Sequence, residues 1–70
     1  MNLLEKCVTV IKELIEKGEL QKGNPIIAES KEILVDDYYN ISQLNKENRS
    51  KASIALEVNK YFADKLGFEV

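Results

Sequence analysis

The sequence predicts an all-α fold, a small three-helix bundle that makes up a single helical domain over residues 1–70. Three observations predict it. Apolar side chains recur every three or four residues through most of the chain, which is the spacing of one helix face. The three glycines and the only proline fall in residues 18–25 and at Gly67, where helices would end or begin. The strict apolar–polar alternation that is typical of strands is weak throughout.

We expect the first helix over residues 2–17. Its apolar stripe is widened by Leu3 and Val10, and charged side chains occupy the other side. Gly18 is the natural stop, because glycine adopts the left-handed backbone conformation without steric cost. The stripe itself consists of Leu4, Cys7, Ile11 and Leu14.

The second helix is predicted over residues 25–39. Asn24 followed by Pro25 is a helix-start signature, with asparagine as N-cap and proline at the first helical position. The turn Asn40-Ile41-Ser42 is expected to end this helix. Its better apolar stripe consists of Ile27, Leu34, Tyr38 and Ile41, with Ile26 and Ile33 beside it.

The third helix is predicted from about residue 45 to residue 66. Residues 45–51 are purely polar, so either the helix crosses solvent there or it starts only at Asn48 or Ser50. We expect one helix from about Asn45, ended by Gly67 with Phe68 folding back on the last turn. Two stripes follow helical spacing: Leu44, Ala52, Ala55, Leu56, Asn59, Phe62, Ala63 and Leu66 form one, and Ile54, Val58 and Tyr61 form the second.

Size and composition place the chain among small globular domains. It has 44% hydrophobic and 31% charged residues and a net charge of −2, with acids and bases interleaved. The amino terminus lacks the apolar core of a signal peptide, and no apolar run reaches the length of a membrane span. These features predict a cytoplasmic protein with a reduced lone thiol. Abundant lysine, asparagine and isoleucine suggest an AT-rich genome, that of a low-GC bacterium, its phage or a plasmid.

Few residues are suited to catalysis. The chain has no histidine and one cysteine, so acid–base chemistry would depend on carboxylates, lysine, tyrosine or that thiol. Cys7 lies on an apolar stripe and is predicted to be a small buried residue. Glu32 and Asp36, one turn apart, could face a cation but are expected to form a solvated acidic surface. We therefore predict no enzyme activity, no cofactor and no bound metal.

The surplus of apolar residues indicates an interaction protein. The first and third helices carry more hydrophobic positions than one three-helix core requires, and a broad apolar arc must be covered by something. We predict a non-enzymatic protein–protein interaction module, a homodimer or an adaptor, inhibitor or regulator of a larger bacterial protein. The alternative is that a wide core uses these residues internally. The predicted interface consists of Val8, Ile15, Tyr39, Ile54, Val58 and Tyr61.

A second hypothesis is a small DNA-binding regulator. The start of the third helix is modestly basic, and Asn48 and Arg49 could read bases while Lys51 contacts phosphate. Residues 40–42 would then be the turn of a helix-turn-helix arrangement. The net negative charge and the lack of glycine in that turn count against it. Neither a membrane nor a small-molecule substrate is predicted as a partner.

Overall fold

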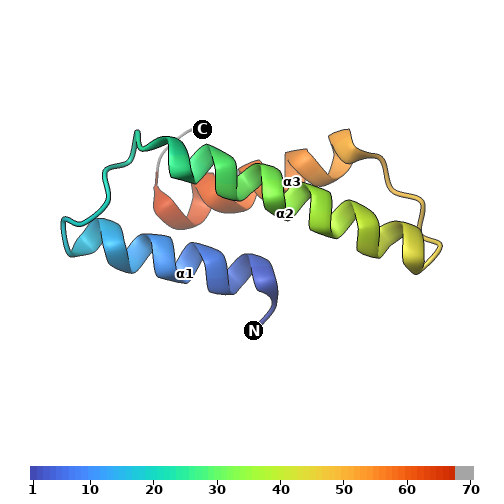
Figure 1. The fold of residues 1–70 in the computed structure, drawn as a ribbon, viewed down its shortest axis with the longest axis horizontal. Coiled ribbons are helices and arrows are strands. Elements are labelled where there is room, and N and C mark those ends of the chain that lie inside the picture. Colours follow the sequence, from blue (N-terminus) through green and yellow to red (C-terminus); the bar gives the residue numbers. More distant parts are fainter. Residues whose placement is uncertain (68–70) are drawn as a thin grey trace.

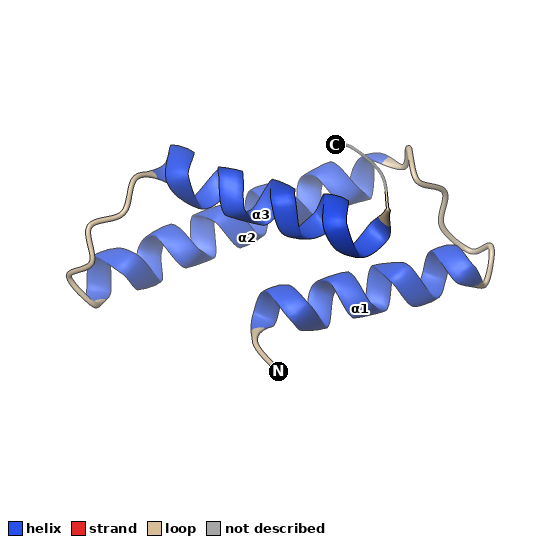
Figure 2. Cartoon of the chain, turned by 180° about the vertical axis from the view of Figure 1, so that it is seen from behind, coloured by secondary structure: helices blue, strands red, loops and turns tan. Residues whose placement is uncertain are grey.

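Three helices make up the fold, as the sequence predicts. The computed structural model describes residues 1–67, in which α1 spans Leu3–Glu16, α2 spans Pro25–Leu44 and α3 spans Lys51–Leu66. Figure 1 shows α1 and α2 side by side and running in opposite directions. Seen from behind, α3 crosses α2, and α1 lies along one side of the pair (Figure 2). The all-α prediction is confirmed, and no strand forms within residues 1–67.

Each helix begins where a side-chain oxygen accepts a hydrogen bond from a free backbone N–H. Asn2 Oδ1 caps α1 by accepting from Glu5 at 2.8 Å, and Asn24 Oδ1 caps α2 by accepting from Ile26 at 2.9 Å. Pro25 follows Asn24 at the first helical position, as predicted. These bonds satisfy donors that have no partner inside the helix.

Both predicted glycine stops are confirmed. Gly18 and Gly67 have φ values of 74° and 75°, in the left-handed region that side chains with a Cβ rarely adopt. The Gly67 N–H donates to the Ala63 carbonyl at 2.9 Å and so closes the last turn of α3. The expectation for Phe68 lies outside the described residues.

The predicted end of the second helix is wrong. Residues 40–42 are not a turn, because α2 continues through them to Leu44. Asparagine and serine are only a few tenths of a kcal/mol worse than average in a helix, so one favourable tertiary contact outweighs them. Ser42 provides that contact, since its side chain is buried against the loop that follows.

The predicted start of the third helix is also wrong, and the alternative start at Ser50 is right. Residues 45–50 form a loop in which Lys46 and Asn48 have φ values of 59° and 54°. Such left-handed residues cannot belong to a right-handed helix. Ser50 then caps α3, because its Oγ accepts from the Ser53 N–H at 3.1 Å.

The core lies between all three helices and is centred on α3. The most extensive contact is between α2 and α3, and α1 packs more closely on α3 than on α2. Phe62 is completely buried. The other buried hydrophobic side chains are Val8 and Ile11 of α1, Ile27 and Leu34 of α2, and Ile54 and Val58 of α3.

Three of the predicted interface residues therefore belong to the core. Val8, Ile54 and Val58 are each no more than 3% exposed, so no partner can reach them in this fold. On α3, the side chains at 54, 58 and 62 point to the core at four-residue spacing, whereas Leu56 points away and is 72% exposed. The branched and aromatic side chains of Ile54, Val58 and Phe62 fill the space between the helices. The stripe that contains Ala52, Ala55 and Ala63 would fill it less well.

This placement makes a prediction about folding. Ile54→Asp with Val58→Asp should unfold the chain, because two carboxylates would be forced into an apolar core with no partner. Loss of helical circular dichroism would measure this. Leu56→Asp, on the opposite side of the same helix, should remain folded. A folded double variant would show that α3 does not pack through this stripe.

Candidate functional site

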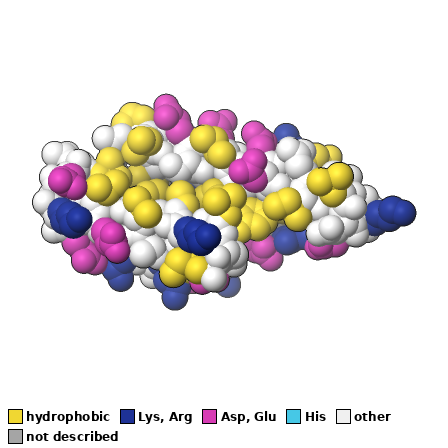
Figure 3. All heavy atoms as spheres, turned by 60° about the horizontal axis from the view of Figure 1, so that its bottom comes forward, with side chains coloured by type: hydrophobic (Ala, Val, Ile, Leu, Met, Phe, Trp, Pro, Cys, Tyr) yellow, Lys and Arg dark blue, Asp and Glu magenta, His cyan; other side chains and the backbone are white. Residues whose placement is uncertain are grey.

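An apolar groove runs between α1 and α2 on the surface of the molecule. It consists of two adjoining hollows of about 420 and 240 Å³, which share Leu3, Cys7 and Ser30. Figure 3 shows the corresponding band of hydrophobic side chains along the long axis of this face. The α1–α2 groove, as we call it, is lined mainly by Leu3, Cys7, Val10 and Leu14 of α1, Leu20 of the loop, and Ile26, Ser30 and Ile33 of α2.

Large apolar side chains in this groove are open to solvent. Leu3 and Val10 of α1 are 47% and 55% exposed, and Ile26 and Ile33 of α2 are 50% and 61% exposed. Members of each pair are seven residues apart, or two helix turns, so each pair lies on one face of its helix. Single exposed hydrophobic residues are normal in proteins, but a contiguous set marks an interaction surface.

The groove is open because α1 packs on α3 rather than fully onto α2. Val8 and Ile11 are the side chains by which α1 enters the core, and the face with Leu3 and Val10 is rotated away from it.

Cys7 lies in the groove but is not activated. Its side chain is half-buried, and burial raises the pKa of the thiol, while a hydrogen bond with Ser30 acts in the opposite direction. A nucleophilic thiol needs a lowered pKa. Cys7 is thus a small apolar lining residue, close to the prediction made for it.

The three remaining predicted interface residues do not form one surface. Ile15, Tyr39 and Tyr61 are half-buried and pack at the margins of the core. The Lys51 Nζ lies 5.2 Å from the centre of the Tyr39 ring, and the Lys65 Nζ lies 5.7 Å from that of Tyr61. The fold does not bring the six predicted residues together.

Sequence reasoning missed the residues that do form a continuous apolar surface. Ile26 and Ile33 were assigned to the side of a core stripe, and Leu3 and Val10 to the widening of another. The available signal was the seven-residue spacing within each pair. Spacing shows that two side chains share a face, but not whether that face is covered.

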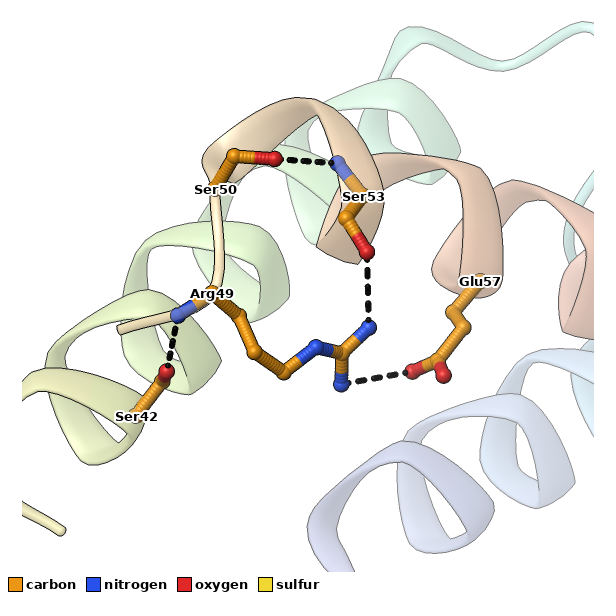
Figure 4. Close-up of polar contacts among 5 residues, drawn as sticks. All are labelled: Ser42, Arg49, Ser50, Ser53 and Glu57. Atoms are coloured by element: carbon orange, nitrogen blue, oxygen red, sulfur yellow. Dashed lines mark hydrogen bonds and ion pairs between the residues drawn. The ribbon is translucent and has the colours of Figure 1, made fainter. Parts of the chain in front are cut away.

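The three predicted base-reading and phosphate-contacting residues contact other parts of the chain, and Figure 4 shows the contacts of Arg49. Arg49 Nη1 lies 3.1 Å from Glu57 Oε2, and Arg49 Nη2 donates to Ser53 Oγ at 3.1 Å. Lys51 forms an ion pair with Asp36 at 3.3 Å. Asn48 and Arg49 belong to a loop and not to a helix, so the arrangement predicted for a helix-turn-helix is not formed.

These contacts fix the connection between α2 and α3. The buried Ser42 Oγ accepts from the Arg49 backbone N–H at 2.9 Å, which ties the end of the loop to α2 (Figure 4). The Arg49 side chain then joins the loop to the first two turns of α3. This polar cluster has a structural role that is complete within the chain.

Other kinds of site find little support in the described residues. Within residues 1–67, no group of three histidine, cysteine or acidic side chains is placed to hold a metal ion. None of the helices in that range combines the length and the apolar character needed to cross a bilayer. Comparison of the chain with protein-family models, with curated proteins and with solved structures finds no match.

The polar cluster yields a prediction about stability. Ser42→Ala should lower the free energy of unfolding by about 1–3 kcal/mol, because the part-buried Arg49 N–H loses its acceptor. Glu57→Gln should cost less than about 1 kcal/mol, because its ion pair is solvent-exposed. Urea unfolding at one protein concentration measures both. Equal losses would mean that the Ser42 bond does not fasten the loop.

The thiol yields a prediction about reactivity. Because its pKa is raised, folded Cys7 should react with iodoacetamide more slowly at neutral pH than the same thiol in the urea-unfolded chain. Its rate should rise as the pH approaches the raised pKa. The protonated thiol is favoured in the folded state, so this contribution to stability is lost as the pH rises through that pKa. Faster labelling of the folded protein would indicate an activated nucleophile instead.

Proposed function

We propose that this chain is a non-enzymatic protein-interaction module that binds through the α1–α2 groove. The observation that carries the proposal is the continuous, uncovered apolar lining, in which Leu3, Val10, Ile26 and Ile33 are each about half exposed. A helix or a pair of helices with an apolar face would fit such a groove. The role of an adaptor, inhibitor or regulator is compatible with this surface.

The free energy gained by burying the apolar lining limits how tightly a partner can bind through this lining alone. Complete burial of a large aliphatic side chain contributes about 1.5–3 kcal/mol, so four half-exposed ones contribute about 3–6 kcal/mol. Association costs at least about 4 kcal/mol in lost translational and rotational freedom. The apolar lining alone therefore supports only weak binding, and a specific partner must also contact the polar edges of the groove.

We also propose that the protein is located in the cytoplasm and comes from a bacterium, a phage or a plasmid. A single half-buried thiol suits a reducing compartment, which supports the cytoplasm. The abundance of lysine, asparagine and isoleucine, residues that AT-rich genomes favour, supports a bacterial, phage or plasmid source.

Site-specific photo-cross-linking tests the proposed function. A photoreactive amino acid replacing Val10 in the groove should give covalent adducts with a protein when the chain is produced in its native cell. The same amino acid replacing Leu56, which is exposed on the far side of α3, is the matched control and should give none.

A second variant makes this test specific to the groove. Ile33→Glu, which puts a charge on the α2 side of the groove, should abolish the adducts while leaving helical circular dichroism unchanged, because residue 33 is exposed. If position 56 cross-links as strongly as position 10, or if Ile33→Glu has no effect, the proposed binding surface is wrong.

A further inference from the structure

We infer that α1 is a hinged lid, which opens as one unit from the α2–α3 hairpin, the pair of helices Pro25–Leu44 and Lys51–Leu66, while that hairpin stays folded. Three features of the molecule support this: the bonding of the two loops, the few side chains that hold α1, and the place of α1 at the side of the hairpin. Such an opening is a property of the fold and does not depend on a partner in the α1–α2 groove.

The loop between α1 and α2 contains a break in backbone hydrogen bonding. The N–H groups of residues 18–20 donate back to carbonyls in the last turn of α1, at 2.9–3.2 Å. The Asn24 N–H donates to the Gln21 carbonyl at 3.0 Å, at the start of α2. In residues 1–67, no backbone hydrogen bond joins the first group to the second. The chain can therefore turn between Leu20 and Gln21 while both sets of bonds remain in place.

The loop between α2 and α3 is bonded to both of its helices. The Arg49 N–H donates to Ser42 Oγ of α2 at 2.9 Å, and the Arg49 side chain bonds to the first two turns of α3. Lys51 of α3 also pairs with Asp36 of α2 at 3.3 Å and lies 5.2 Å from the centre of the Tyr39 ring. None of these contacts involves α1, so they persist when α1 leaves.

Few side chains hold α1 on the hairpin. Val8 and Ile11 are its fully buried side chains, and the Cys7 thiol adds a weak hydrogen bond to α2. The Leu4 N–H donates to the Tyr38 hydroxyl of α2 at 3.1 Å. This bond satisfies a donor in the first turn of α1 that has no partner inside the helix. It lies at the end of α1 far from the hinge and so acts as a latch.

The place of α1 in the fold allows it to leave without disturbing the hairpin. Figure 2 shows α1 along one side of the crossed pair of α2 and α3. The most extensive helix–helix contact in the described chain joins α2 and α3. Elements with few buried contacts open at a lower free energy than the core does. Opening uncovers Val8, Ile11 and the core side chains against which they pack, an apolar surface that the closed state hides.

Native-state hydrogen exchange of the whole chain in low concentrations of urea tests the inference. Small domains usually unfold as one cooperative unit, so a separate opening of α1 is distinguishable. The protected amides of α1 should share one free energy of opening, with protection about tenfold or more below that of the amides around Val58 in α3. Their opening should depend less on urea, because release of one helix exposes less surface than global unfolding does.

Two variants separate the latch from the hairpin. Tyr38→Phe removes only the hydroxyl and should speed exchange in α1 roughly two- to tenfold. Exchange in α3 should rise by the same factor, because the latch is broken in global unfolding too. Ser42→Ala should speed exchange in α2 and α3 by about fivefold or more and leave α1 unchanged, because its bond to Arg49 remains intact when only α1 opens.

The response of α1 to Ser42→Ala gives the clearest contradiction. If this variant speeds exchange equally in all three helices, the chain opens as a single unit and α1 is no lid. Equal protection and equal urea dependence of α1 and α3 in the wild-type chain would overturn the inference in the same way. Exchange in α1 that is unaffected by Tyr38→Phe would show that the Leu4–Tyr38 bond is not its latch.

Discussion

The packing of one face of α3 against the other two helices is the constraint on which the structure depends. Ile54, Val58 and Phe62 supply this face, and Phe62 is the most completely buried of the core side chains in residues 1–67. A domain of 70 residues buries only about 60% of the surface that its unfolded chain exposes, so it has little reserve beyond this core. The rotation of each helix follows from the need to cover these three side chains.

That constraint explains why a groove is left open. α1 turns Val8 and Ile11 toward α3, and this rotation carries Leu3 and Val10 out of the core. α2 likewise turns Ile27 and Leu34 inward and leaves Ile26 and Ile33 outside. The two outward faces lie next to each other, so their apolar side chains form one continuous surface. An exposed face of this kind costs solubility, and association with a partner removes that cost.

The sequence predicted the parts of this structure that depend on local chemistry. Periodicity identified three helices, and the Asn24-Pro25 start and the Gly18 and Gly67 stops were correct because each rests on the backbone preference of one residue. The boundary between α2 and α3 was missed. It depends on the buried Ser42 hydroxyl and its bond to the Arg49 N–H, a contact between residues that helix propensity does not describe.

The candidate site was less predictable for a related reason. The sequence indicated a surplus of apolar residues, but Val8, Ile54 and Val58 proved to be core and Leu3, Val10, Ile26 and Ile33 proved to be exposed. Two stripes on one helix differ only in which of them faces the neighbouring helices, and that is a tertiary property. The most direct test of the central claim, that packing on α3 leaves the α1–α2 groove uncovered, is to measure how a soluble paramagnetic probe relaxes the methyl NMR signals of the folded chain. We predict strong relaxation for Val10 and Ile33, and weak relaxation for Ile54 and Val58. Protected methyl groups at Val10 and Ile33, or strongly relaxed ones at Ile54 and Val58, would contradict it.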